Sequence, residues 1–185
     1  MAARLIELGE GLDLREIDET LARPIFEAID GDRERLGRWM GFVELTLTVE
    51  DELAFCRDAM QAAKRGVAKH FSIFGRGRVA GGIGFHSIQH QFRTAEVGYW
   101  LVAAFEGRGV MARALRAMLE LAFDEMRLHR VQVRIDPRNA RSIGVVERLG
   151  FRYEGCMRQA AWIRGEPFDC SLLAIVAPDW NRARI

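Results

Sequence analysis

The sequence has no long apolar run and almost no net charge. Its 185 residues carry 27 Lys and Arg against 26 Asp and Glu, a formal charge of +1, so no overall field draws the chain to nucleic acid or to an anionic membrane. No stretch approaches the roughly 20 apolar residues that cross a bilayer. The first residues become acidic within about ten positions, unlike a signal peptide. These absences predict a cytoplasmic protein with no nucleic-acid partner and no membrane association.

Metal-binding patterns are also missing. Cys56, Cys156 and Cys170 form no CxxC pair, and the four histidines form no HExxH motif. His86 and His90 are four residues apart, but they lie in a stretch typical of a strand and turn, where that spacing does not make a common face. We therefore expect reduced thiols and no bound metal.

What is present indicates one globular domain over residues 1–185. Apolar residues make up 49% and charged residues 29%, and no linker or repeat divides the chain. Apolar spacing predicts helices at 19–29, 48–66, 110–126 and 139–149 and strands at 11–17, 68–75, 78–88, 94–102, 131–136, 151–157 and 170–176. Residues 32–42 fit a short helix or an irregular loop. Short turns between strands 68–102 indicate an antiparallel meander, so the fold class is α+β.

The most informative segment is a glycine-rich turn, Glu106–Ala112 (EGRGVMA), between a strand and a helix. Glycine allows a positive φ and a close approach to a ligand, and the free N–H groups of the following helix attract anions. The turn therefore predicts a phosphate or pyrophosphate site, although a tight turn before a helix has the same pattern. Gly107, Gly109 and Ala112 also match the dinucleotide fingerprint GxGxxA. Asp136 lies too far along the chain for the ribose acid, and a doubly wound sheet needs repeated strand–helix alternation.

Several short motifs follow one another in a diagnostic order. They are Ala95–Leu101 (AEVGYWL), Glu106–Ala112, Asn139–Ser142 (NARS), Glu147–Phe151 (ERLGF) and Glu154–Gly155. This ordered set resembles the GCN5-related N-acetyltransferase (GNAT) superfamily, within it the branch that acetylates the N-termini of ribosomal proteins, and the resemblance is strongest over 68–176. It implies one domain with a twisted mixed sheet flanked by helices. Two central strands, here 94–102 and 131–136, would splay apart to admit the arm of acetyl-CoA.

The resemblance also implies a pyrophosphate loop. Its members here would be Glu106, Gly107, Arg108, Gly109, Val110, Met111 and Ala112. Gly109 matches the required glycine of the family pattern, whereas Glu106 and Met111 depart from it. Because backbone N–H groups hold the phosphates, these departures need not abolish the site. A carboxylate at 106 would repel a pyrophosphate unless it pointed outward, and Arg108 would offset it by lying along the phosphates or would be a solvated turn residue.

Four further residues would hold the rest of the acetyl-CoA arm. Leu101 and Val102 would offer main-chain groups to the pantetheine, like an added strand. Asn139 would hydrogen-bond the pantetheine, and Ser142 would lie near the thioester sulfur. The alternative for Asn139 is a helix N-cap with Ser142 in the first turn, and both roles are compatible.

Acetyl transfer to an amine requires a base and a way to accept the departing thiolate. Glu96 is the candidate base, which requires a pKa raised by burial; its alternative is a structural pairing with an arginine on a neighbouring strand. Ser142 is the candidate on the thiol side, with Tyr153 as a weaker donor. His70 or water is the alternative base. Cys156 is interpreted as a packing residue.

The acetyl acceptor is favoured to be a protein or peptide N-terminal α-amine, by resemblance alone. A small amine is the alternative within enzymes, and a non-catalytic acyl-CoA-binding regulator is the alternative outside them. Residues 30–66 are expected to shape the acceptor entrance. Within them, Trp39, Met40 and Phe42 are either acceptor contacts or buried core.

Overall fold

A single eight-stranded sheet organises the chain in a computed structural model that describes residues 4–183. Its order is β1-β2-β3-β4-β5-β6-β8-β7. The strands are β1 Leu5–Gly9, β2 Leu12–Glu16, β3 Lys69–Gly75, β4 Arg78–Gln89, β5 Thr94–Leu101, β6 Arg130–Ile135, β7 Arg152–Ile163 and β8 Glu166–Val176. All neighbours are antiparallel except β5 and β6, which are parallel. The predicted mixed sheet and its meander are confirmed.

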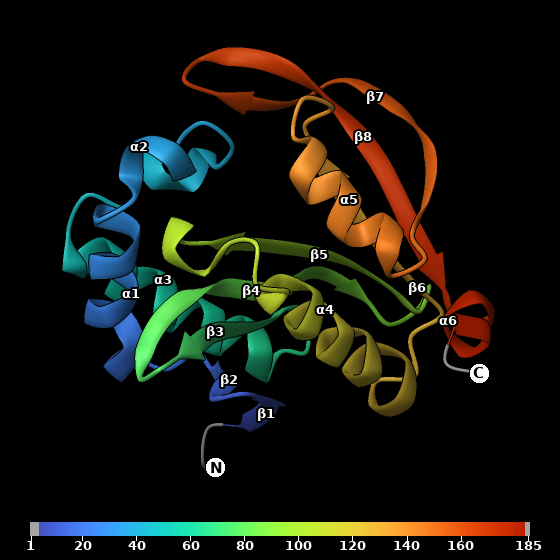
Figure 1. Ribbon diagram of the computed structural model, residues 1–185, viewed down its shortest axis with the longest axis horizontal. Coiled ribbons are helices and arrows are strands. Elements are labelled where there is room, and N and C mark those ends of the chain that lie inside the picture. Colours follow the sequence, from blue (N-terminus) through green and yellow to red (C-terminus); the bar gives the residue numbers. More distant parts are fainter. Residues whose placement is uncertain (1–3, 184–185) are drawn as a thin grey trace.

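Helices cover both faces of this sheet (Figure 1). They are α1 Ala22–Asp30, α2 Arg33–Leu36, α3 Val49–Lys64, α4 Val110–Glu120, α5 Ala140–Arg148 and α6 Ala177–Ala183, with 3₁₀ turns η1 Glu19–Leu21, η2 Gly41–Glu44 and η3 Ala103–Phe105 and a π turn η4 Leu121–Glu125. α4 and α5 pack in the larger core, and α1 and α3 pack in a second core on the opposite face. Within residues 4–183, no helix combines the length and apolarity needed to span a bilayer.

Local sequence signals account for the helix ends. Thr48 and Asp51 form a reciprocal capping box at the start of α3, and Gly66 follows its end with φ of 72°. The helix predicted at 110–126 begins as expected. It ends in the π turn, where the last turn widens before the chain enters β6.

The sequence prediction differed from the structure mainly at the two ends of the chain. β1 and α6 were not predicted. β7 and β8 run well beyond the predicted strands 151–157 and 170–176 and pair with each other as one long hairpin. Figure 1 shows this hairpin rising from the rest of the sheet, with its tip directed toward α2.

The hairpin tip contacts the segment between α2 and α3. Arg164 Nε lies 3.2 Å from a carboxylate oxygen of Glu44 on η2. A β-carbon at Gly41 would lie 3.4 Å from the carbonyl oxygen of Trp162, so the two backbones are close there. The hairpin tip and the segment between α2 and α3 therefore lie together at one end of the molecule.

β5 and β6 separate after a short ladder. Their register covers only Thr94–Glu96 of β5 against Arg130–Gln132 of β6. β5 then continues to Leu101 and β6 to Ile135 without pairing to each other. The predicted splay of the central strands is confirmed, and it begins at Glu96.

Alternation divides the side chains of β5 between the two faces. Val97 and Tyr99 point into the core with α4 and α5, whereas Trp100 packs in the core with α1 and α3. Glu96 shares the face of Trp100. Beyond Glu96, β5 therefore directs side chains to both faces of the sheet along an edge that does not pair with β6.

Candidate active site

A cleft of about 720 Å³ lies between α2, the end of β5 and the N-termini of α4 and α5. Nine predicted site residues line it: Leu101, Glu106, Gly107, Gly109, Val110, Met111, Ala112, Asn139 and Ser142. Val102, Arg108 and Glu96 do not line it. The structure therefore gathers most of the residues that the sequence assigned to the acetyl-CoA arm.

The turn before α4 has the backbone geometry of an anion site. Gly107 and Gly109 have φ of 72° and 71°, values that residues with a β-carbon rarely adopt. Gly109 is the N-cap of α4, so the N–H groups of Val110, Met111 and Ala112 have no acceptor within the helix. These groups and the helix dipole favour a bound phosphate.

Glu106 does not leave an uncompensated negative charge in the cleft. Its carboxylate lies 2.5 Å from Arg35 on α2 and 2.5 Å from Arg141 on α5. Arg35 also pairs with Asp32, so the two guanidinium groups balance two carboxylates and Glu106 adds no net negative charge to the cleft. Arg108 is exposed and does not line the cleft, so its interpretation as a solvated turn residue fits better.

The main-chain groups expected to meet the pantetheine are largely engaged within the protein. The Val102 N–H donates to the Ala80 carbonyl at 2.8 Å, and the Val102 carbonyl accepts from Phe105 at 3.0 Å. The Leu101 carbonyl accepts from Arg35 at 2.6 Å. The expectation for Val102 is therefore corrected, because its backbone already completes the β4–β5 edge and the η3 turn.

Asn139 and Ser142 meet at the start of α5. Asn139 Oδ1 accepts from the Ser142 N–H at 3.1 Å, so Asn139 is the N-cap. The Ser142 hydroxyl lies 2.8 Å from the hydroxyl of Tyr99, and burial raises the Tyr99 pKa to about 12. The sequence analysis missed Tyr99, although alternation along β5 could have placed it on the cofactor face.

Glu96 departs from its predicted role. It is buried, yet its carboxylate accepts from Arg134 at 2.7 Å and Gln132 at 3.1 Å, and lies 3.1 Å from His86 Nε2. Desolvation alone would raise the pKa, but these partners outweigh it and lower the pKa to about 2. The expected raised pKa is wrong, because the carboxylate stays ionised and paired with an arginine on the neighbouring strand. Glu96 is therefore unsuited to accept a proton near neutral pH.

Three other candidates also lie away from the cleft. His70 is packed edge-on against Phe55, with ring centroids 5.5 Å apart, and burial lowers its pKa to about 4. Tyr153, the weaker donor candidate, is exposed on β7. Cys156 is exposed rather than packed. Its pKa is raised, which favours the protonated thiol over the nucleophilic thiolate.

The segment 30–66 borders the cleft as expected, but its aromatic residues divide between two roles. Trp39 and Met40 line the cleft. Phe42 packs against Trp100 with ring centroids 6.3 Å apart and belongs to the second core. Met40 also packs against this second core, so one residue can both line the cleft and belong to the core.

The sheet is split after Glu96, and a glycine turn with the geometry of an anion site opens the helix α4. The profile of the family described as "Acetyltransferase (GNAT) domain" matches residues 12–152. The chain belongs to this family, and it is an acetyltransferase, as the sequence predicted.

Some relatives match nearly the whole chain and others a shorter part of it. The ribosomal-protein-serine acetyltransferase of Escherichia coli (strain K12) is 29% identical over 169 residues, covering 91% of this chain and 94% of the relative. The probable N-acetyltransferase YjcK of Bacillus subtilis (strain 168) is 35% identical over 135 residues, covering 71% and 75%. The solved structure of RimL, the ribosomal L7/L12 alpha-N-protein acetyltransferase, in complex with coenzyme A has a TM-score of 0.90 at 25% identity, covering 94% and 98%. The predicted likeness to ribosomal-protein acetyltransferases is confirmed.

Proposed function

We propose that this chain transfers the acetyl group of acetyl-CoA to the α-amine of a protein or peptide N-terminus. The observation that carries the proposal is the opening between β5 and β6, which adjoins a turn built to hold a pyrophosphate. The coenzyme A in the RimL structure and the ribosomal-protein substrates in the names of its relatives support it. Relatives that are acetyltransferases favour an enzyme over a non-catalytic regulator.

The cofactor residues follow the geometry of the cleft. Acetyl-CoA supplies the acetyl group as a thioester. The N–H groups that open α4 bind the pyrophosphate, with Arg35 and Arg141 nearby. The unpaired edge of β5 after Glu96 pairs with the amides of the pantetheine as an added strand would. Asn139 borders this arm from the start of α5.

Ser142 and Tyr99 serve the departing thiolate. Their hydroxyls lie 2.8 Å apart, so Tyr99 holds Ser142 in place through the hydrogen bond. The raised pKa of Tyr99 keeps that group protonated at neutral pH. This arrangement gives the departing sulfur a neutral donor rather than a second anion.

The acceptor assignment is tested by turnover of acetyl-CoA with a library of N-terminal peptides and a panel of small amines, read by mass. We expect acetylated peptide α-amines, and no product from the same peptides with a blocked N-terminus. Acetylation of small amines alone would replace the proposed acceptor, and no turnover with either set would contradict the proposal.

Gly109→Val tests the cofactor site. The structure shows open space around a β-carbon at Gly109, so the substitution acts through the positive φ and not through a protein clash. Strain of roughly 1–2 kcal/mol should weaken coenzyme A binding about tenfold by moving the first turn of α4. Calorimetry with coenzyme A measures this. Gly77→Val, at a turn with φ of 74° away from the cleft, is the matched control and should strain the fold without weakening binding.

A further inference from the structure

A polar cluster occupies the sheet face opposite α4 and α5. It joins His86 on β4, Glu96 on β5, and Gln132 and Arg134 on β6. Glu96 is the centre, because each of the other three lies 2.7–3.1 Å from its carboxylate. The cluster lies where the β5–β6 ladder ends, since Glu96 and Gln132 are its last pair.

The carboxylate at the centre of this cluster is already saturated. Glu96 Oε1 faces both His86 and Arg134, and Oε2 accepts from Gln132. Such a group holds its neighbours in place and does not accept a proton itself. Glu96 can therefore act on the reaction only through the groups that it orients.

His86 is the member of the cluster that offers an unused basic atom. Its Nε2 lies 3.1 Å from Glu96, and an ionised carboxylate only accepts, so in the neutral ring Nε2 carries the hydrogen. This tautomer leaves the lone pair on Nδ1, which has no hydrogen-bond partner among residues 4–183. The side chain is 42% exposed, so an acceptor amine can approach it.

The ring is also placed beside the opening in the sheet. A β-carbon at Gly98 would lie 3.0 Å from His86 Cε1 and 3.4 Å from Nδ1, so the ring leans from β4 over the backbone of β5. Gly98 comes two residues after the last residue of β5 that pairs with β6. The absence of a side chain at Gly98 thus lets the Nδ1 edge of His86 reach the point where the strands part.

We propose that His86 is the general base of the acetyl transfer and that Glu96 is the positioning residue that fixes its tautomer. This inference rests on the proposed function. His86 Nδ1 takes one proton from the ammonium of the acceptor and passes it to solvent. The free amine forms the N–C bond with the acetyl carbonyl carbon, and the C–S bond breaks with its electron pair on sulfur. Ser142 protonates the sulfur, and the second proton lost by nitrogen restores the hydroxyl through solvent.

Three charged or titratable groups face His86. Glu96 favours the imidazolium, Arg134 opposes it from β6, and His70 lies on β3 next to β4. Because burial lowers the pKa of His70 to about 4, that ring is neutral across the working range and adds no charge.

The experiment compares His86→Gln with His90→Gln, a control in an exposed turn where His90 bonds the Gly66 carbonyl. We expect kcat/KM with an N-terminal peptide to fall about 100-fold in His86→Gln, and its rise with pH to flatten. Coenzyme A affinity and Tm should match wild type. Wild-type kcat/KM, or an unchanged pH profile, in His86→Gln would overturn the assignment.

A second readout does not depend on activity. The 15N NMR shifts of the neutral His86 ring should place its hydrogen on Nε2, which faces Glu96. In Glu96→Gln that preference should weaken, because an amide can either donate to Nε2 or accept from it. A hydrogen on Nδ1 in the wild type, or a preference that Glu96→Gln leaves unchanged, would overturn the dyad. Absence of turnover in the wild type would instead contradict the proposed function.

Discussion

Two buried glutamates of this protein, Glu96 and Glu52, behave in opposite ways. Glu96 on β5 is 9% exposed and Glu52 on α3 is 3% exposed. The pKa of Glu96 falls to about 2, whereas that of Glu52 rises to about 7. Glu96 is surrounded by donors from β4 and β6, and the only cause acting on Glu52 is desolvation.

The comparison shows that burial fixes neither the charge nor the role of a carboxylate. Donors on neighbouring strands convert a buried Glu96 into a permanent anion that orients other groups. Cys56 follows Glu52 by one helical turn and is also buried. The pKa of the Cys56 thiol is raised to about 12, by burial and by the charge of Glu52. A buried carboxylate in a catalytic fold is therefore assigned a role from its donors and not from its depth.

Removing the charge of Glu52 should have the largest effect. The pKa of Glu52 in the folded protein lies above its unfolded value near 4.5. The contribution of Glu52 to the free energy of unfolding is therefore fully present at low pH and is lost as the pH rises through about 7. Glu52→Gln should therefore stabilise the protein at pH 9, by up to roughly 3 kcal/mol, and change little at pH 4. Denaturant unfolding at both pH values measures this. Glu50→Gln on the exposed side of α3 is the control, and equal effects of both variants would contradict the reasoning.

Glu96→Gln should act in the opposite direction. Its folded pKa lies below the unfolded value, so its contribution is present above pH 4.5 and is lost as the pH falls through about 2. The variant should lose about 2 kcal/mol at pH 7, because Arg134 is left without its carboxylate, and the wild-type and variant stabilities should converge in acid. Acid titrations of unfolding free energy measure the convergence. A constant difference down to pH 2 would show that packing, not charge, is responsible.

Thr48→Ala should have the smallest effect on stability. It tests the comparison of carboxylates within one turn of α3. Asp51 and Glu52 are adjacent, but Asp51 accepts from the Thr48 hydroxyl and from the backbone N–H groups of Leu47 and Thr48, which lower its pKa. Loss of the cap should cost about 1 kcal/mol. Thr48→Ser retains the hydroxyl and should stay near wild type in the same thermal melts. If Thr48→Ala melted like Thr48→Ser, the capping box would contribute nothing.

Local signals accounted for much of the fold. The Thr48 cap and the glycine after α3 fixed that helix, and the short turns fixed the β3–β5 meander. The strand–turn–helix around Gly109 predicted the anion site from residues that are neighbours in the sequence. These features depend on hydrogen bonds between residues close together in the chain, which a sequence displays directly.

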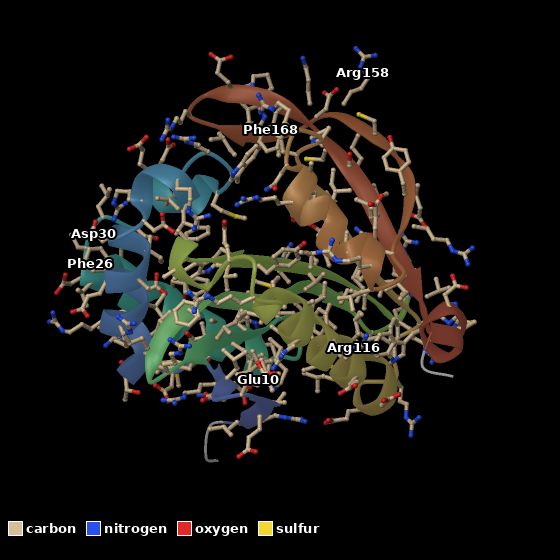
Figure 2. The ribbon with its side chains drawn as sticks, in the orientation of Figure 1. Glu10, Phe26, Asp30, Arg116, Arg158 and Phe168 are labelled. Carbon is tan, nitrogen blue, oxygen red and sulfur yellow. The ribbon has the colours of Figure 1, made fainter. Side chains whose placement is uncertain are left out.

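Contacts between distant segments were not predictable in the same way. The full length of β7 and β8 depends on their mutual ladder, and their exposed sequence lacks the alternation of a half-buried strand. In Figure 2, Arg158 points outward from this hairpin, while Phe168 lies on the inner side of the hairpin. Phe168 and Arg138 line a second, smaller pocket there. The pKa of Glu96 was predicted with the wrong sign because three partners come from two other strands.

The short ladder between β5 and β6 has a mechanical consequence. Three residue pairs form the seam in the sheet between the part built from β1–β5 and the part built from β6–β8. A ligand arm lying in the opening would lengthen that seam by adding bonds on one or both sides. Binding of the arm should then slow amide hydrogen exchange along β6 more than along β3. The bound arm would act as a temporary strand that joins the two parts of the sheet.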